Sequence, residues 1–301
     1  ADKSSSLYLK QVSLTASSTG IAFYLLAVNS LTIDLTSLDG NAKTQAIYCE
    51  SCKSITITNS NFANFLGNIC GSVLQFYHPA TLVLSSTYST ATIQITDCTF
   101  TGNQAVNSST LPKGGAICLD AEDPMIIYDG KFENTTFVNN AASDEGGAIF
   151  YKCQPKDCNV EISDSNFINN KADNQGGALS FELQPFIANL SEVTFEGNNA
   201  SYGTNIAAYA VALILIPADS TIYSQSGRGL QESSGYSFVS GQAVTPSLKF
   251  ALVDEFDQIY TPDSGSTLTA SLGDDSAQFL SQRTARAVKG VYVLNLTLET
   301  D

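Results

Sequence analysis

A short phrase recurs, in degraded copies, along the first two thirds of the chain. It reads Phe-x-x-Asn-x-Ala, then a spacer, then Gly-Gly-Ala followed by Ile or Leu. The clearest copies span residues 137–149 and 167–179, a third starts at Phe100, and the copy at Phe195 decays before its glycine pair. Self-similarity at a period of roughly 20–50 residues indicates a solenoid. The repeat therefore predicts the architecture of this part of the chain.

The position of the repeat phenylalanine, here called the anchor, can be followed through seven copies. Neighbouring anchors are 24 to 38 residues apart, so each unit combines a constant core with a variable loop. The seven anchors are Leu14, Leu38, Phe62, Phe100, Phe137, Phe167 and Phe195.

The residues just before the anchors alternate between aliphatic and small polar side chains, as at 31–35, 55–58, 93–96 and 160–163. Period-two alternation predicts strands, and no stretch shows a sustained helical period. Strands without intervening helices must stack by coiling. We therefore predict an all-β chain in which residues 1–223 form a right-handed parallel β-helix of about seven or more rungs.

The repeated residues have structural roles in such a coil. Stacked anchors bury apolar area and fix the register of the strands. An asparagine at a turn can hydrogen-bond its neighbour in the next rung, and a glycine pair allows a positive φ and close backbone approach. Asn41 also follows its anchor by three residues. The ladder predicted to be structural comprises Phe62, Phe100, Phe137, Phe167, Phe195, Asn103, Asn140, Asn170 and Asn198.

The pairing of Phe-x-x-Asn with Gly-Gly-Ala-Ile/Leu resembles the repeats of chlamydial-type polymorphic outer-membrane proteins. It resembles even more the pectin-lyase-like repeats of large secreted or surface-anchored ciliate proteins, because residues 200–209 and 241–259 resemble the end of those arrays and the module that follows. The resemblance covers residues 55–301, apart from a long loop at 104–113 and Phe65 where asparagine is expected. It implies surface display and adhesion.

The chain is acidic, with a formal net charge of −15, and only 14% of its residues are charged. This charge disfavours nucleic acid and anionic membranes as partners, because phosphate surfaces repel it. The longest apolar run, residues 206–216, is too short to span a bilayer and predicts a strand pair that closes the solenoid. The chain starts at Ala1 without a signal-peptide pattern, which favours a processed or partial sequence.

Five Asn-x-Ser/Thr sequons predict covalent N-linked glycans and an extracellular or cell-surface location. The sequon in the long loop is the most accessible, and those next to predicted strands require outward-facing side chains. The sequon asparagines are Asn107, Asn134, Asn189, Asn199 and Asn295.

Seven cysteines are typical of an oxidising compartment. Cys153 and Cys158 bracket a turn sequence and are predicted to pair. Cys49 and Cys52 are interpreted as a small disulfide loop or as parts of two cross-rung bonds, because the only histidine, His78, gives little support to a zinc site and is expected in a loop. We predict no metal and no cofactor. Because the remaining cysteines are odd in number, one thiol is expected to be free or bonded to a missing segment or another chain. The cysteines expected to be oxidised or cross-linking are Cys49, Cys52, Cys70, Cys98 and Cys118.

Residues 224–240 are rich in Ser and Gly and are predicted to be a linker. Residues 241–301 carry short apolar runs separated by turn residues, which predicts an immunoglobulin-like β-sandwich module, incomplete at this length. The acidic residues at 254–257 and 274–275 match no spaced calcium loop and are interpreted as turns. The predicted strands are 246–254, 258–261, 266–272, 277–281 and 290–298.

Two functional classes remain. The first is an extracellular structural or adhesive glycoprotein that self-associates into filaments, because the open ends of a β-helix can pair with another copy. The second is a polysaccharide-binding or polysaccharide-cleaving protein. Cleavage needs clustered carboxylates on successive rungs. Asp97, Asp164 and Glu161 lie near equivalent positions, and the densest acidic group, at 120–123, has no visible cationic partner. We therefore expect no enzymatic activity, and polysaccharide or cell-surface partners.

Overall fold

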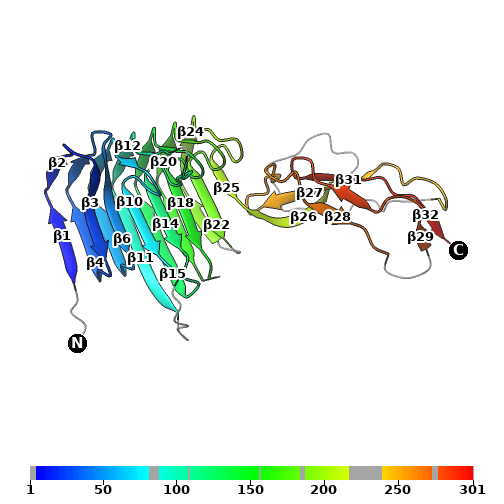
Figure 1. The fold of residues 1–301 in the computed structure, drawn as a ribbon, viewed down its shortest axis with the longest axis horizontal. Helices are drawn as coiled ribbons and strands as arrows, with labels where there is room; N and C mark the ends of the chain where they lie inside the picture. The colour runs from blue at the N-terminus through cyan, green and yellow to red at the C-terminus, as the bar shows by residue number, and fades with distance from the viewer. Residues whose placement is uncertain are drawn as a thin grey trace. The chain divides into compact units, whose positions relative to one another are not determined.

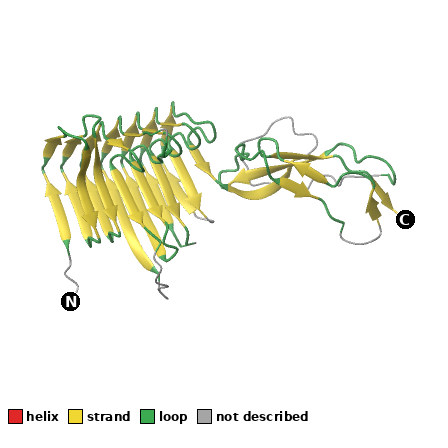
Figure 2. Cartoon of the chain, in the orientation of Figure 1, coloured by secondary structure: helices red, strands yellow, loops and turns green. Residues whose placement is uncertain are grey.

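The computed structural model describes residues 5–80, 88–107, 109–155, 157–183, 187–216, 239–272 and 277–300. The chain divides into two compact units, Ala1–Ala208 (unit 1) and Tyr209–Asp301 (unit 2). Within the described residues, all regular elements are strands joined by turns and loops, as Figure 2 shows. The prediction of an all-β chain is confirmed.

Unit 1 is a coil of parallel strands with seven rungs in its described residues. Each rung gives one strand to each of three seven-stranded parallel sheets, named I, II and IV in chain order, and four rungs add a two-residue strand to a small sheet III. In Figure 1 the strands of each sheet lie side by side, starting from blue β1. This is the predicted parallel β-helix; its hand stays a prediction.

The strands of unit 1 are short and recur in the same order in each rung. Sheet I contains β1 (Ser6–Lys10), β4 (Ser30–Asp34), β7 (Ser54–Thr58), β11 (Ser89–Thr96), β15 (Ile126–Glu133), β19 (Asn159–Ser163) and β23 (Ile187–Ser191). Sheet II contains β2 (Ser13–Thr15), β5 (Ser37–Asp39), β8 (Asn61–Ala63), β12 (Thr99–Thr101), β16 (Thr136–Val138), β20 (Asn166–Ile168) and β24 (Thr194–Glu196). Sheet III contains β9 (Leu66–Gly67), β13 (Gln104–Ala105), β17 (Ala141–Ala142) and β21 (Lys171–Ala172). Sheet IV contains β3 (Gly20–Leu26), β6 (Thr44–Glu50), β10 (Leu74–His78), β14 (Ile117–Ala121), β18 (Ile149–Cys153), β22 (Leu179–Leu183) and β25 (Ile206–Ala208).

The strand register places the seven anchors in one line across sheet II, from Leu14 to Phe195. The five phenylalanine rings stack with centroid separations of 4.8–5.3 Å. Those from Phe62 to Phe167 are fully buried. Burial of one such ring contributes roughly 1.5–3 kcal/mol. Because a one-residue slip would turn an anchor toward solvent, the stack also fixes the register.

The corners of the coil explain much of the repeat. Before each strand of sheet II the chain turns through one residue with positive φ, three positions ahead of the anchor. In the last five rungs the chain turns before sheet IV through a glycine with φ between 57° and 67°. Asparagine, aspartate and glycine tolerate this conformation best. The corner residues ahead of the anchors are Gln11, Leu35, Asn59, Asp97, Asn134, Asp164 and Glu192.

Unit 2 contains three small antiparallel sheets in its described residues. Its strands are β26 (Ala210–Ile216), β27 (Leu248–Asp254) and β31 (Val291–Leu294) in one sheet, β28 (Thr267–Thr269) with β30 (Thr284–Arg286), and β29 (Ala277–Phe279) with β32 (Leu298–Thr300). Its main core is a cluster of Val244, Ala285, Ala287, Tyr292, Leu294 and Leu296. An acidic turn follows β27, where the buried Asp254 accepts backbone hydrogen bonds from Phe256 and Gln258.

The predictions for this region differ from the structure in three places. The run 206–216 does not close the solenoid: β25 belongs to sheet IV, whereas β26 pairs with β27 of unit 2. Residues 258–261 form only an isolated bridge at Ile259, and β30 was not predicted. The predicted linker and the pair 274–275 lie outside the described residues, apart from 239–240.

Candidate functional site

The repeat asparagines form a continuous ladder inside the coil. The amide nitrogen of Asn140 donates to the Asn170 side-chain oxygen (2.9 Å) and to the backbone oxygen of Phe100 (3.0 Å). Asn103 and Asn170 repeat the same two bonds one rung away on either side. The last member, Asn198, donates to the side chain of Asn205. All four ladder asparagines are buried, so the ladder is structural.

Asn41 was expected at the equivalent position but takes no part in this ladder. Its φ is 48°, its side chain is exposed, and its amide lies 3.4 Å from the backbone oxygen of Ala16. Asn41 and Ala42 both have positive φ and widen this corner. A residue three positions after the anchor therefore no longer turns its side chain inward. In the next rung the ladder position is taken by Phe65, whose backbone nitrogen donates to Asn103.

Three disulfides cross-link the chain within the described residues of unit 1. Cys153 bonds to Cys158, and Cys49 to Cys52, each closing a short loop after a sheet IV strand. The second bond leaves no thiolate for zinc at that pair. Cys70 bonds to Cys118, joining one rung to the next across a separation of 48 residues. The two cysteines form a buried cluster with Phe150.

Cys98 is the thiol that remains. It is 2% exposed, and its sulfur lies 3.1 Å from the backbone oxygen of Thr96. Burial raises the pKa of this thiol to about 11. Of the alternatives for the odd cysteine, the structure shows the free thiol, which is buried and protonated and therefore unreactive.

The sequon asparagines all carry side chains that reach the surface. Asn134, Asn189, Asn199 and Asn295 are exposed, and Asn107 is half-buried. The amide of Asn134 donates to Asp97 of the preceding rung at 2.6 Å. The oxygen of Asn107 accepts a hydrogen bond from the backbone of Ser109, which forms a turn at the sequon.

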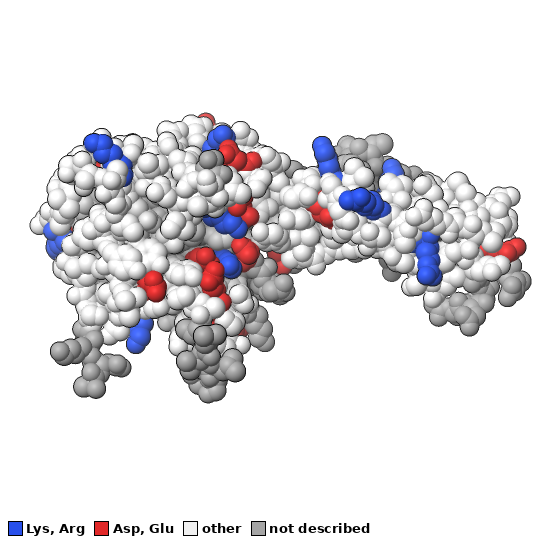
Figure 3. Space-filling model, in the orientation of Figure 1, with Lys and Arg blue, Asp and Glu red and all other residues white. Residues whose placement is uncertain are grey.

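A group of charged side chains lies on the outer face of sheet IV. Figure 3 shows lysine and acidic side chains close together where Figure 1 draws β14, β18 and β22. The register aligns one outward position from six successive rungs, here called the outer column, and the inward residue before each member from Glu50 onward is buried. The outer column consists of Leu26, Glu50, Tyr77, Asp120, Lys152 and Glu182.

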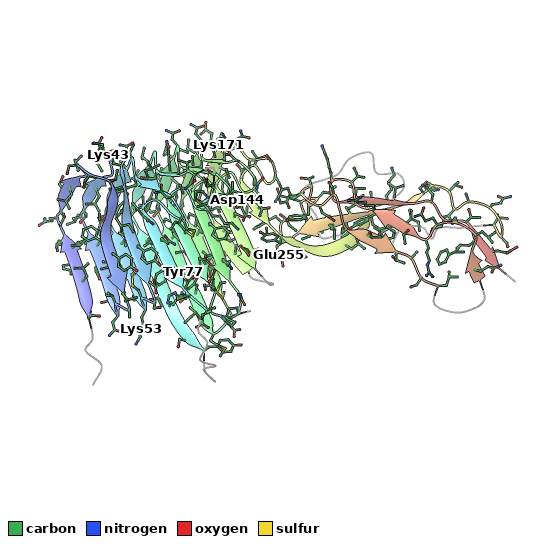
Figure 4. The ribbon with its side chains drawn as sticks, viewed as in Figure 1. Lys43, Lys53, Tyr77, Asp144, Lys171 and Glu255 are labelled. Atoms are coloured by element: carbon green, nitrogen blue, oxygen red, sulfur yellow. A yellow bond between two sulfur atoms is a disulfide. The ribbon has the colours of Figure 1, made fainter. Side chains whose placement is uncertain are left out.

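Neighbouring side chains form hydrogen bonds or ion pairs with most members of the outer column. Tyr48 donates to Glu50 (2.9 Å), and Tyr77, labelled in Figure 4, donates to Glu122 (2.8 Å). Burial and the hydrogen bond to Glu122 raise the pKa of Tyr77 to about 12. Its hydroxyl therefore stays protonated at neutral pH and acts as a donor.

Lys113 covers one end of the column. Its ammonium group lies 3.2 Å from Glu145, 3.3 Å from Glu182 and 4.6 Å from the ring centre of Phe150. Burial lowers the pKa of Lys113, but the two carboxylates outweigh it, so the pKa is raised. The ammonium group of Lys113 therefore links the glycine corner before β14 to β22, which lies two rungs later.

Asp120 and Lys152 form the centre of the column. Lys152 Nζ lies 3.5 Å from Asp120 Oδ1, and both side chains are about one-fifth exposed. The expectation that the 120–123 acidic group lacks a cation is therefore wrong. Burial raises the pKa of Asp120 against the effect of Lys152. A sequence signal existed, because Asp120, Lys152 and Glu182 each lie five residues after the second glycine of a pair.

The other carboxylates considered for catalysis do not converge. Asp97 and Asp164 occupy corners two rungs apart, whereas Glu161 lies within β19. Asp123 is buried, and its carboxylate caps the turn at Met125. Among the described residues, no group of three or more His, Cys, Asp or Glu side chains is placed to hold a metal ion. Nor does any described helix have the length and apolarity to cross a membrane.

His78 does not lie in a loop but ends β10, 6% exposed. Its Nδ1 lies 2.9 Å from the Tyr128 hydroxyl, and the ring also hydrogen-bonds the backbone of Cys52. Its backbone oxygen accepts from Glu122 and Asp123. The period-two alternation of Leu74, Phe76 and His78 was the signal for its inward direction.

Burial lowers the pKa of His78 to about 4, against the opposing effects of the Cys52 hydrogen bond and Asp123. Because the unfolded chain binds this proton at about pH 6.5, stability is complete above that pH and is lost as pH falls toward 4. We expect a loss of roughly 3 kcal/mol from this residue between pH 7 and pH 4. Urea unfolding of the wild type and of His78→Gln across this range measures it; equal pH slopes would contradict it.

Three segments of the chain match the model of the Chlamydia polymorphic membrane protein repeat: residues 97–120, 134–152 and 164–182. Each match begins at the positive-φ corner residue ahead of an anchor and ends at the outer column. It therefore covers the sheet II, III and IV strands of one rung, and the predicted resemblance to these repeats is confirmed. Comparisons with curated proteins and with solved structures returned no match. The likeness to ciliate proteins stays a prediction.

Proposed function

We propose that this protein is an extracellular or cell-surface structural or adhesive protein that carries no enzymatic activity. The repeat it shares with a bacterial membrane-protein family supports surface display. Its three disulfides support folding in an oxidising compartment. Its acidic charge makes nucleic acid and direct membrane insertion poor alternatives.

The observation that carries this proposal is that the residues that recur in each rung are structural, whereas the outward-facing residues vary. The recurring residues are the anchors, the ladder asparagines and the glycine corners. All of them except Leu14, which is exposed in the first rung, pack inside or turn the chain. The outward positions differ from rung to rung. Such a coil is a rigid scaffold on which outer side chains and loops are displayed.

The finer parts of the proposal concern assembly and modification. Strand edges at the ends of a parallel coil can pair with another copy, which supports filament growth. The five surface sequons support N-glycosylation of the protein. The small antiparallel sheets of unit 2 are compatible with an incomplete immunoglobulin-like module, and a right-handed coil is the expected hand.

Antibody labelling of intact and permeabilised source cells tests the location. We expect equal labelling of both, with loss of signal after protease treatment of intact cells. Labelling that requires permeabilisation would overturn the proposal. Electron microscopy of the native material, before and after enzymatic deglycosylation, tests the filament: regular fibres support it, and isolated particles contradict it.

A second candidate function is polysaccharide recognition. The observation that favours it is the outer column, where carboxylates, a lysine and a tyrosine hydroxyl follow one another at the spacing of the rungs. These side chains lie on the outer face of the sheet, opposite the buried residues that form the core.

A further inference from the structure

We propose that copies of this chain bind one another through two oppositely charged patches, an acidic patch on unit 1 and a basic patch on unit 2. The inference rests on the proposed self-association of the protein and names a contact other than the strand edges at the ends of the coil. The acidic patch lies on the outer face of sheet IV, and the basic patch lies along and beside β30.

The acidic patch combines exposed apolar side chains with carboxylates. Tyr24 and Leu26, both in β3, are 61% and 60% exposed. Tyr24 stacks on Tyr48 with ring centroids 4.9 Å apart, and because its ring is still so exposed, its other face is open to a partner. Large exposed rings beside charges are typical of protein interfaces. The acidic patch consists of Tyr24, Leu26, Tyr48, Glu50, Tyr77 and Glu122.

Glu50 and Glu122 carry the uncompensated charge of this patch. Each accepts a tyrosine hydroxyl through one carboxylate oxygen, at 2.9 Å and 2.8 Å, which fixes the carboxylate but leaves its charge. Among the described residues neither carboxylate forms an ion pair, and Lys113 and Lys152 on the same face pair with other acids. The face therefore attracts a cationic partner.

The basic patch matches the acidic one in both charge and apolar content. Arg283, Arg286 and Lys289 are exposed, and within the part of unit 2 that the structure describes none of them forms an ion pair. Val288, beside Lys289, is 70% exposed. The residues on either side of Arg286 are buried in the core of unit 2, so strand alternation turns Arg286 outward. The basic patch consists of Arg283, Arg286, Val288 and Lys289.

The chemistry of the two patches is complementary. A guanidinium group donates two parallel hydrogen bonds to a carboxylate and also stacks on an aromatic face. Glu50 and Glu122 offer the carboxylates, and the open face of Tyr24 offers the ring. Contact between the patches also removes the exposed side chains of Leu26 and Val288 from water. A second copy of the chain thus supplies the cations that the acidic patch lacks.

The contact joins unlike surfaces, because the two patches lie on different units. A pair of copies joined in this way keeps one unused acidic patch and one unused basic patch. Further copies can add at both, so the assembly grows as an open filament unless its rotation closes a ring. Since part of the attraction is between exposed charges, salt weakens it.

The test is sedimentation velocity of the full chain from micromolar to millimolar concentrations, at roughly 0.1 M and 1 M salt. We expect the sedimentation coefficient of the wild type to rise with concentration, and to rise less at the higher salt. The acid-reversed variant is Glu50→Arg with Glu122→Arg. The base-reversed variant is Arg283→Glu with Arg286→Glu. Each variant alone is expected to associate at least about tenfold more weakly than the wild type, because both of its patches then carry the same sign.

An equal mixture of the two reversed variants should associate as the wild type does, because every patch then finds one of opposite charge on the other variant. The matched control is Glu161→Arg with Glu196→Arg, which changes the net charge as the acid-reversed variant does but on sheets I and II. Its association should equal that of the wild type. Circular dichroism checks that each variant is folded.

Four outcomes overturn the proposal. The wild type could stay at a single mass at every concentration, or either reversed variant could associate as the wild type does. The mixture of folded variants could fail to associate. The control could lose association as fully as the acid-reversed variant, which would assign the effect to net charge alone. All four leave the surface location untouched, because the antibody experiment on intact cells tests that separately, and electron microscopy still tests whether filaments form by another contact.

Discussion

Asn140→Ala is expected to destabilise unit 1 by about 3–5 kcal/mol, because Asn140 lies in the middle of the buried ladder. The side chain of Asn140 makes four hydrogen bonds. Its oxygen accepts from the backbone nitrogen (3.1 Å) and the amide (2.9 Å) of Asn103, and its amide donates to Phe100 and Asn170. Alanine leaves two donors of Asn103 without partners in a fully buried site.

The matched control for this variant is Asn174→Ala. Asn174 also donates across one rung, to Asp144 at 2.7 Å, but the pair is exposed and water can replace it. We expect a loss of no more than about 1 kcal/mol for the control. Urea unfolding followed by circular dichroism measures both. Similar losses for the two variants would mean that the buried ladder is no more important than a surface contact.

Gly147→Ala is expected to prevent the coil from closing at that rung, with a loss above about 4 kcal/mol. A Cβ at this position would lie 2.0 Å from the backbone oxygen of Gly177 and 2.6 Å from backbone atoms of Lys171. No rotamer change can relieve a clash with backbone. The glycine is required because two rungs approach closely here, so a Cβ would force the adjoining strands to separate.

Gly130→Ala supplies the contrast. Its Cβ would meet the nearest atoms at 3.5–3.8 Å, which is ordinary van der Waals contact. We expect a neutral or slightly stabilising effect of up to about 1 kcal/mol, because alanine restricts the unfolded chain. Soluble yield and the thermal midpoint of both variants give the comparison. A folded Gly147→Ala protein with the wild-type midpoint would refute the close-approach argument.

The features predicted from sequence were those that recur at fixed offsets. Each ladder asparagine lies three residues after its anchor, and a glycine corner follows each of these anchors, so the repeat predicted which residues of successive rungs lie in register. Asn41 shows the limit of this reasoning. Its offset from Leu38 is correct, but two consecutive positive-φ residues turn it to the outside.

The features that were missed depend on contacts between rungs. Variable loops separate Asp120 from Lys152, and Cys70 from Cys118, so the distance along the chain indicates neither pair. Only the shared offset of five residues from a glycine pair links Asp120 to Lys152. The run 206–216 appeared continuous because every residue in it favours a strand. Its division between sheet IV and the sheet of unit 2 is set by the partner strands, which no local pattern records.

The hydrogen bonds of the asparagine ladder run in one direction, and a defined group ends the ladder on each side. One N–H of each ladder amide donates to the side-chain oxygen of the next asparagine, in the later rung, so the dipoles of these side-chain bonds align and reinforce one another. The backbone nitrogen of Phe65 terminates the accepting end, and the side chain of Asn205 terminates the donating end. The four asparagines thus form a hydrogen-bonded chain whose two ends are both satisfied within the coil. Rungs added before Phe65 or after Asn205 would neither lengthen nor interrupt this chain.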